Sequence, residues 1–390
     1  MKKVVIASAC RTPIGRIPGE INFISDTKLL ALSFKEVINR CGISDQHIDG
    51  AYTGCSFPVE RDNLCRKAIL EAGLSEKING ATISKTCASS DEAIMNGVYK
   101  ILCGEAKIIL IGGIEKISNS SYALHYLKKN VKNMMKNNLL KFDEISQGIE
   151  ENDMTFICEM LSRKFDIRRE EQDQFAFNSI SKALSALKTG KFNDEIFEVE
   201  YLSGDNHHKL NMDELLQTEK SKEQIYSAMP VFISDGTLTQ FNTSLMCDCA
   251  ASMILMDYET AIHMNITPLA EIQSTCSIGI DNNDFRGIGM VEAIKCILNK
   301  TGLKIDDIDL FELNESFAVQ AILCQKALNI NPEKINVNGG NLAIGYPIGC
   351  TGIRMGITLI YEMLRRKANI GLSTICAGGN MGHATIYKRI

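Results

Sequence analysis

The sequence predicts an α/β protein made of a duplicated unit, with a further segment inserted between the two copies. Short apolar segments alternate with longer segments of helical spacing, which is the pattern of helices packed on mostly parallel, buried sheets. A series of matching segments recurs in the second half of the chain. The 390 residues, 45% of them hydrophobic and 23% charged, are enough for two or three soluble domains.

The internal repeat consists of short segments that match in the same order. The matching pairs are VINRCGIS at 37–44 with ILNKTGLK at 297–304, Ile48-Asp49 with Ile308-Asp309, Ser56-Phe57 with Ser316-Phe317, LCRKAIL at 64–70 with LCQKALN at 323–329, and EKIN at 76–79 with EKIN at 333–336. One match could arise by chance, but a collinear series indicates two copies of one unit that pack as a pseudo-twofold pair.

Both copies show the same alternation of predicted elements. In the first we expect a strand after MKK at the N-terminus, helices near 34–41, 64–74 and 93–102, and strands at 50–55, 81–87 and 107–113. In the second we expect helices at 290–300, 317–328 and 351–366, and strands at 309–313, 334–338 and 371–376.

The segment between the copies, about 119–248, has a different character. It is rich in Lys, Asn, Met and Gln, and contains a charged helical stretch at 170–190. This composition predicts a loop or lid domain over a site and not a third core. We therefore divide the chain into an N-terminal half of 1–118 plus 249–267, an inserted domain of 119–248, and a C-terminal half of 268–390.

Composition and charge exclude several classes of function. The net charge of -5 gives no basic footprint for nucleic acid. No segment approaches the roughly 20 apolar residues that a membrane span needs, and the N-terminal apolar run, broken by Arg11, is too short for a secretory signal. Fourteen cysteines without a CxxC pair indicate reduced thiols in the cytoplasm. Cys247 and Cys249 form a lone CxC, which we do not expect to bind metal.

Four segments carry residues that could do chemistry. Cys87 is predicted where a strand ends and a helix begins, near the positive end of a helix dipole that favours the thiolate, although a packed core thiol is the simpler interpretation. Asn314 follows a strand and could equally be a helix cap. Cys376 ends another strand, and Gly378 after it could aim a backbone N–H at a developing oxyanion.

The fourth segment, NGGNLAIGYPIGCTG at 338–352, is dense in glycine, which permits close approach to a ligand but also simply makes tight turns. Gly287 and Gly289 half-match a dinucleotide fingerprint, but the third glycine and a preceding apolar strand are missing, so we expect no such site there. In a duplicated α/β fold, the strand ends of both halves converge at one crevice, where two thiols, an amide and flexible backbone could share a pocket.

Taken in order, these motifs resemble those of the thiolases, specifically the acetyl-CoA acetyltransferase type. The resemblance spans the chain from VVIASACRTPIG to CAGGNMG. It includes TCASS around Cys87, REEQDQFA in the insertion, DGTLTQFNTS at 235–244, NESFA at 314–318 and GGNLAIGYPIGCTG at 339–352. It implies the thiolase fold, a duplicated five-layer α/β/α/β/α unit with an inserted loop domain.

The resemblance also implies roles for individual residues. Cys87 matches the nucleophile that acyl-CoA acylates, and Cys376 the second cysteine, which takes a proton from the attacking acetyl-CoA. Asn314 matches an amide that holds water in one oxyanion hole, and the N–H groups of Cys87 and Gly378 match the other. Ser244 matches a serine near the CoA pantetheine arm. Met154 and Phe317 match positions in the substrate pocket.

Several positions depart from the family pattern, and Tyr346 is the most consequential. It replaces the histidine of the GHP motif, which activates the nucleophile and donates to the thioester oxyanion. A phenol can still donate, but with a pKa of about 10 it is a poor base at neutral pH. His383 is the one histidine near a site motif that could compensate. The other departures are Ser84 for Asn, Ser90 for Gly, Leu245 for Gly in the CoA-contact loop, and Asp153-Met154-Thr155 for the HMG-type start of a pocket segment.

The leading hypothesis is therefore an acetyl-CoA C-acetyltransferase that works through Cys87 and a reversible Claisen condensation. Its partners are acyl-CoA and CoA, its expected assembly is a homodimer or homotetramer, and it needs no cofactor because CoA arrives with the substrate. Two alternatives remain at this point. The chain could be a CoA-binding or scaffolding protein impaired by Tyr346, or a condensing acyltransferase with an unusual acceptor.

Overall fold

Nine strands form the main sheet of the computed structural model, which describes residues 2–58, 62–119, 154–203, 206–280 and 287–390. The strands are β1 (Val4–Arg11), β2 (Gly50–Gly54), β3 (Asn79–Ile83), β4 (Ile108–Glu115), β7 (Cys249–Asp257), β8 (Ala270–Gly279), β9 (Leu310–Leu313), β10 (Ile370–Ala377) and β11 (Met381–Lys388). They are ordered β3-β2-β4-β7-β1-β8-β11-β10-β9. The two halves of this order join only where β1 meets β8, through Val5–Glu271 and Ile6–Ala270.

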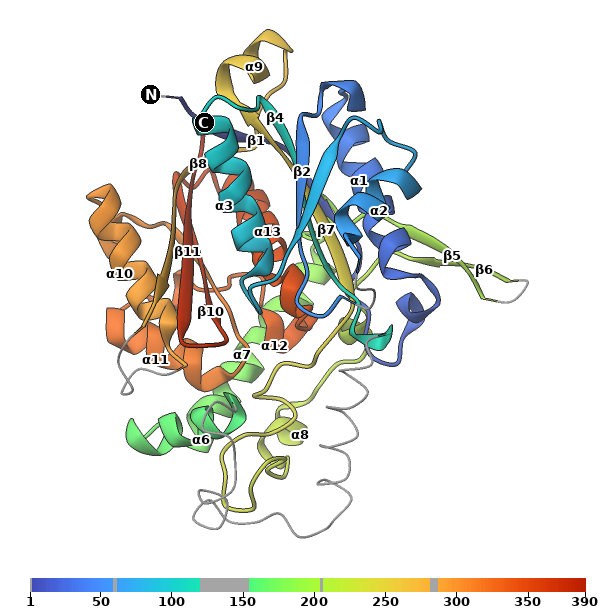
Figure 1. The fold of residues 1–390 in the computed structure, drawn as a ribbon. Coiled ribbons are helices and arrows are strands. Elements are labelled where there is room, and N and C mark those ends of the chain that lie inside the picture. Colours follow the sequence, from blue (N-terminus) through green and yellow to red (C-terminus); the bar gives the residue numbers. More distant parts are fainter. Residues whose placement is uncertain (1, 59–61, 120–153, 204–205, 281–286) are drawn as a thin grey trace.

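The helices cover and separate the two halves of the sheet. They are α1 (Asp26–Cys41), α2 (Leu64–Glu71), α3 (Ser89–Leu102), α9 (Tyr258–His263), α10 (Gly289–Thr301), α11 (Ala318–Leu328), α12 (Asn341–Ile344) and α13 (Thr351–Arg366). Figure 1 shows α1 and α2 on one outer face, α10 and α11 on the other, and α3 with α13 between the sheet halves. This is the expected five-layer α/β/α/β/α arrangement, and the fold class is confirmed.

The strand order repeats the duplication seen in the sequence. Read outward from the junction, β1, β7, β4 and β2 in the first half correspond to β8, β11, β10 and β9 in the second. A carboxylate is repeated with them. Asp49 Oδ2 accepts the N–H groups of Lys107 and Ile108 at 2.7 and 3.0 Å, and Asp309 Oδ2 accepts those of Asn369 and Ile370 at the same two distances.

The prediction of a strand at 334–338 is wrong. A short 3-10 helix (Pro332–Lys334) precedes a single bridge between Ile335 and Phe311. The Asn336 side chain explains the difference, because it donates to the carbonyl of Leu313 at 2.9 Å and accepts from its N–H at 2.8 Å. A side-chain amide thus satisfies backbone groups that a neighbouring strand would pair with. The strand expected at 81–87 is also shorter, because β3 ends at Ile83 and a turn follows.

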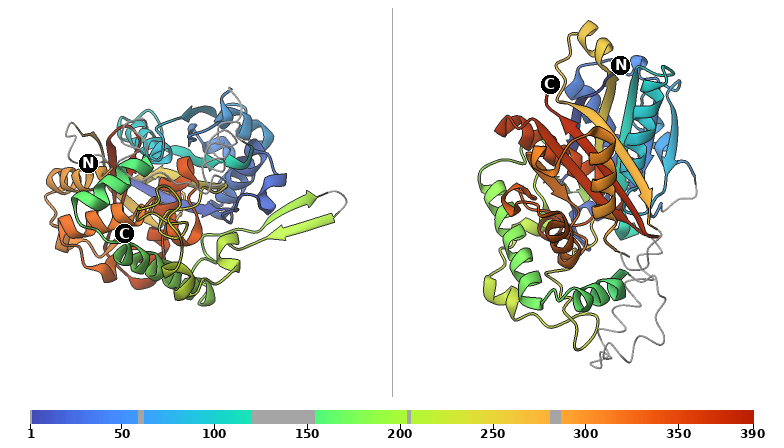
Figure 2. Two further views of the ribbon diagram at one scale, coloured as in Figure 1. Left: turned by 90° about the horizontal axis from the view of Figure 1, so that it is seen from below. Right: turned by 90° about the vertical axis from the view of Figure 1, so that its left-hand side faces the viewer.

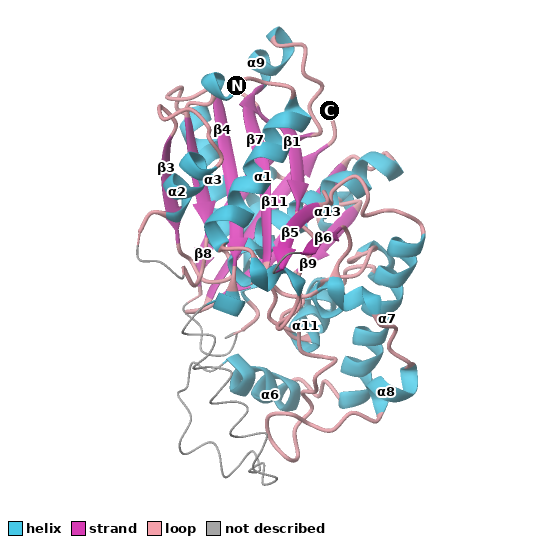
Figure 3. Cartoon of the chain, turned by 90° about the vertical axis from the view of Figure 1, so that its right-hand side faces the viewer, coloured by secondary structure: helices cyan, strands magenta, loops and turns pink. Residues whose placement is uncertain are grey.

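The inserted segment lies beside the carboxyl ends of the parallel strands. It contributes α6 (Met154–Lys164), α7 (Arg169–Lys188), α8 (Lys222–Tyr226) and the hairpin of β5 (Val199–Ser203) and β6 (Asn206–Leu210). Figures 1 and 3 show α6, α7 and α8 below the sheet, and Figure 2 shows the hairpin projecting from the side. The turns after β3, β9 and β10 open toward this end, so the candidate residues share one edge of the fold.

Candidate active site

Cys87 lies in a tight turn between β3 and α3, as the sequence predicts. The residue before it, Thr86, has φ of 48°. For a β-branched side chain this left-handed conformation costs on the order of 1–3 kcal/mol, so it persists only where the surroundings fix it. The turn presents a half-buried thiol at the first residues of α3.

Hydrogen bonds from both halves of the fold hold the strained turn. The Thr86 carbonyl accepts from Ser56 Oγ at 2.5 Å and from Ser89 Oγ at 2.6 Å. Its Oγ1 accepts the backbone N–H of Gly378 at 2.9 Å. Thr86 is a structural residue of the site that motif reading did not single out. Ser56 could have been found, since Ser56-Phe57 belongs to the internal repeat.

The helix terminus favours the Cys87 thiolate as expected, but burial outweighs it. Burial raises the pKa of the Cys87 thiol above its ordinary value, and the nearby carboxyl group of Glu115 adds to the rise. The Tyr346 hydroxyl and the N–H groups of Cys87 and Gly378 oppose it but do not cancel it. The sequence argument weighed the dipole and omitted the desolvation that the surrounding side chains impose.

Tyr346 faces Cys87 across a small apolar cluster. Its ring packs with Ile117 and Ile348, and the Cys87 thiol lies against the same cluster. The backbone of the 245–247 segment fixes its position, because the Tyr346 N–H donates to the Leu245 carbonyl at 2.8 Å and its carbonyl accepts the Cys247 N–H at 3.1 Å.

The Tyr346 hydroxyl is buried, and no group among the described residues meets ordinary hydrogen-bond geometry with it. Burial and the proximity of the Cys87 thiol raise the pKa of Tyr346 well above its usual value, while Ser316 and Asn314 lie near enough to offset part of that rise. At neutral pH this group is a phenol whose proton is available to a ligand, and the Cys87 thiol lies close to it. Such a group can bind a carbonyl oxygen but cannot act as a base.

Asn314 directly follows β9 and does not cap a helix, because α11 begins at Ala318 with Phe317 at its cap position. Its amide donates to Ser316 Oγ at 2.8 Å and accepts from Asn341 Nδ2 at 2.5 Å. Asn341 in turn accepts from the buried guanidinium of Arg354. This relay fixes which end of the Asn314 amide is the donor.

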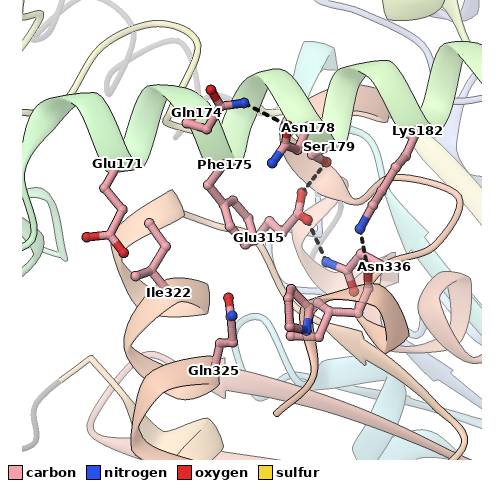
Figure 4. A pocket seen from close by; sticks show the side chains of 12 residues that line it. Glu171, Gln174, Phe175, Asn178, Ser179, Lys182, Glu315, Ile322, Gln325 and Asn336 are labelled. Carbon is pink, nitrogen blue, oxygen red and sulfur yellow. Dashed lines mark hydrogen bonds between the residues drawn. The ribbon is translucent and has the colours of Figure 1, made fainter. Parts of the chain in front are cut away.

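A buried carboxylate anchors the loop that carries Asn314. Glu315 accepts from Ser179 Oγ at 2.8 Å, from Asn336 Nδ2 at 2.5 Å and from the N–H of Leu342 at 3.2 Å. Figure 4 shows Glu315 between α7 and the Asn336 segment, in the wall of a cavity of about 280 Å³. None of the residues predicted to act in the site lines this cavity. The three hydrogen bonds of Glu315 fix the loop that carries its neighbour Asn314.

Cys376 is buried at the end of β10, and its thiol donates to the Gly287 carbonyl at 3.2 Å. Burial raises the pKa of the Cys376 thiol to about 12, and the proximity of Cys87 contributes to the rise. The hydrogen bond between Gly378 and Thr86 joins the turns that carry Cys376 and Cys87, so both cysteines lie in one site. Met154 and Phe317 pack against the apolar cluster that contains Cys376.

Two predicted contacts are already occupied. The Gly378 N–H, expected to face an oxyanion, donates to Thr86 Oγ1. The Ser244 hydroxyl, expected beside pantetheine, donates to the Glu315 carbonyl, and its backbone N–H donates to Ser316 at 2.9 Å. Both groups lie at the site, but in this structure they bind protein. Asp153 lies outside the described residues.

His383 does not take the place of the missing histidine. It pairs with Ile375 across β10 and β11, so strand alternation puts its side chain on the sheet face opposite to that of Cys376. Its Nε2 lies 3.3 Å from Thr385 Oγ1, and burial lowers its pKa to about 3. Within the described ranges, no three His, Cys, Asp or Glu side chains are grouped to hold a metal ion, and no helix could span a membrane.

The two halves share one α/β topology and bring two cysteines and an oriented amide to the same edge of the fold. This is the framework of a cysteine-dependent acyltransferase. Comparison with known proteins agrees. The family described as "Thiolase, N-terminal domain" matches residues 4–259, and "Thiolase, C-terminal domain" matches residues 266–389. The chain belongs to the thiolase family.

Individual relatives match over their full length. An acetyl-CoA acetyltransferase of Rhizobium meliloti is 36% identical, with 99% of each chain covered. The crystal structure of the Bacillus anthracis acetyl-CoA acetyltransferase has a TM-score of 0.90 and 31% identity, and covers 100% of this chain and 99% of that one. Human mitochondrial 3-ketoacyl-CoA thiolase in complex with CoA has a TM-score of 0.88 and 29% identity, with 100% and 98% covered.

Proposed function

We propose that this thiolase transfers an acetyl group from acetyl-CoA to Cys87 and then joins it to a second acetyl-CoA, in a reversible Claisen condensation. The observation that carries the proposal is the buried, unpartnered hydroxyl of Tyr346 beside the Cys87 thiol and the Asn314 amide. Buried polar groups in folded proteins are normally paired. A thioester carbonyl bound over Cys87 would give this hydroxyl the acceptor that it lacks.

The two half-reactions balance with the residues present. In the first, the Cys87 thiolate attacks the thioester carbon, the bond to the CoA sulfur breaks, and CoA leaves with the proton of the Cys376 thiol. In the second, the Cys376 thiolate takes a proton from the methyl carbon of another acetyl-CoA. That carbon attacks the acetyl group on Cys87, and the Cys87–acyl bond breaks as acetoacetyl-CoA forms. We propose that Asn314, whose amide donor is oriented toward Ser316, holds a water toward the second thioester oxygen.

Tyr346 supplies only one of the two functions that a histidine would have there. It donates to the thioester oxygen, which supports formation of the tetrahedral intermediate. It does not deprotonate Cys87, whose pKa burial raises. A well-placed general base is typically worth about 10²–10⁴-fold, so we expect slow acylation whose rate increases with pH.

The partners we propose are acyl-CoA and free CoA, with CoA acting as part of the substrate and no separate cofactor. The solved human relative with CoA bound supports this choice. Phe241 and Leu245 of the loop corresponding to the CoA-contact segment line a cavity of about 520 Å³ together with α7. Because these side chains are bulky, we expect pantetheine to take a different path from the one it takes in relatives with glycine at the position of Leu245.

We also propose a cytoplasmic homo-oligomer. All fourteen cysteines are free thiols, which suits a reducing compartment. The half-exposed strand β3 is an edge of the main sheet, and such an edge can pair with the same strand of a second copy. Light scattering should then show a particle larger than the 43.1 kDa monomer.

The direct test of function is CoA-dependent cleavage of acetoacetyl-CoA by the wild-type chain, Cys87→Ala and Cys376→Ala. We expect activity in the wild type and none above background in either variant. Binding of CoA to the wild type without any turnover would favour the CoA-binding alternative.

A further inference from the structure

Two glycines allow the first turn of α10 to approach Cys376. Gly382 lies directly opposite Cys376 in the β10–β11 ladder. A Cβ atom on Gly382 would lie 2.1 Å from the Gly289 carbonyl oxygen, and one on Gly289 would lie 2.3 Å from the Met381 carbonyl oxygen. Any side chain at either position would therefore push the helix away from the strand. The backbone of α10 begins against the sheet beside the thiol.

The thiol has a defined acceptor and two defined donors nearby. Its proton is directed to the Gly287 carbonyl at 3.2 Å. The N–H groups of Gly289 and Met290 belong to the first turn of α10, where backbone donors have no acceptor within the helix. Both act on Cys376 in the direction that lowers its pKa, against the burial that raises it.

No cationic side chain among the described residues lowers the pKa of Cys376. The titratable groups that face Cys376 are two other thiols, Cys87 from the turn before α3 and Cys324 from α11. Cys87 raises the pKa of Cys376, and Cys324 carries no positive charge. The helix terminus is thus the favourable contribution to an anion on this sulfur.

We propose that the first turn of α10 controls the protonation of Cys376. The N–H groups of Gly289 and Met290 donate to the thiolate, and the Gly287 carbonyl accepts from the thiol. This rests on the proposed function, in which Cys376 takes a proton from the acetyl-CoA methyl carbon. When the sulfur gains that proton, it no longer accepts from the two N–H groups and instead donates to the Gly287 carbonyl. This change needs no movement of the chain. Gly289 and Met290 are positioning residues, since they act through Cys376.

The test compares Met290→Pro with Met290→Ala. Proline removes the N–H and is tolerated in the first turn of a helix, while alanine shortens the same side chain and keeps the N–H. The readout is the rate of alkylation of Cys376 by iodoacetamide between pH 8 and 10, resolved by peptide mass spectrometry. The exposed Cys103 serves as an internal reference. A charge-assisted hydrogen bond is strong enough that we expect Cys376 to react about tenfold more slowly in Met290→Pro.

Equal rates of Cys376 alkylation in the two variants, with Cys103 unchanged, would overturn the proposal. If Met290→Pro does not fold, as judged by circular dichroism, incorporation of the α-hydroxy analogue of methionine at 290 removes the N–H while keeping the side chain. The same tenfold slowing is expected there, and its absence would contradict the proposal equally. Because alkylation needs no turnover, this result is independent of whether the chain condenses acetyl-CoA.

Discussion

The backbone N–H of Gly378 donates to Oγ1 of Thr86 at 2.9 Å, and this bond joins the turns that carry the two thiols of the site. Thr86 directly precedes Cys87, and only Ala377 separates Gly378 from Cys376. The first turn belongs to the N-terminal half and the second to the C-terminal half. The separation of the two sulfurs therefore depends on a contact between the halves as well as on each half alone.

Removal of the Thr86 hydroxyl should loosen this junction. We expect Thr86→Val to lower the free energy of unfolding by about 1 kcal/mol relative to Thr86→Ser, because only serine keeps the acceptor for the Gly378 N–H. Urea denaturation of the two variants measures the difference. Equal stabilities would show that the bond contributes nothing.

Two substitutions of Tyr346 should change the rate of Cys87 acylation in opposite directions. Tyr346→Phe removes a hydroxyl that lowers the pKa of Cys87, so the thiolate becomes rarer and acylation slower, by roughly tenfold or more. Tyr346→His introduces a base and should accelerate acylation by about 10²–10⁴-fold near pH 7. Stopped-flow release of CoA from acetyl-CoA gives both rates. An unchanged rate in Tyr346→Phe would remove Tyr346 from the mechanism.

Asn314 should matter more for condensation than for acylation. Asn314→Asp keeps the acceptor oxygen that Asn341 contacts and loses the donor toward Ser316. Loss of one oriented donor typically costs about 10²–10³-fold in rate. We expect kcat for acetoacetyl-CoA synthesis to decrease to that extent while acylation of Cys87 changes little. Equal loss in both steps would place Asn314 in acylation as well.

Asp91 should make the protein less stable as the pH rises. The carboxyl group is buried in α3 with no partner for Oδ2 among the described residues, and burial raises its pKa to about 7. In the unfolded chain an Asp has a pKa of about 3.9, so the folded state binds the proton more tightly. The stabilisation is complete below about pH 4 and is lost as the pH rises through 7.

The measurement for Asp91 is the free energy of unfolding at pH 4.5 and 7.5. The neutral Asp91→Asn variant should lack this dependence, which we expect to reach about 4 kcal/mol at most. The exposed residue Asp306 provides the matched control, since Asp306→Asn should retain the wild-type profile. Identical pH profiles for wild type and Asp91→Asn would contradict the prediction.

Much of the fold could be predicted from the sequence, because alternation and repetition are properties of the chain itself. The repeat around Asp49 and Asp309 corresponds to two equivalent carboxylate contacts in the structure. The strand at 334–338 could not be rejected in advance. Its apolar pattern is that of a strand, and only the position of the Asn336 side chain against Leu313 shows why none forms.

The candidate site was predictable in its membership and not in its electrostatics. Motifs located Cys87, Asn314, Tyr346 and Cys376, and the structure brings them to one edge. The sequence could not show that burial raises the pKa of Cys87, since burial depends on side chains from distant segments. Nor could it show that the half-matched glycine motif at Gly287 packs against Cys376.

The central claim is that Cys87 accepts an acyl group with a tyrosine in place of a histidine beside it. Intact-protein mass spectrometry after mixing with acetoacetyl-CoA tests it most directly, with Cys87→Ala as the control. We predict that the wild type gains the mass of one acetyl group, that the gain increases between pH 7 and 9, and that Cys87→Ala gains nothing. No adduct on the wild type at any pH, with an adduct restored by Tyr346→His, would contradict the claim and identify a thiolase site disabled at its base.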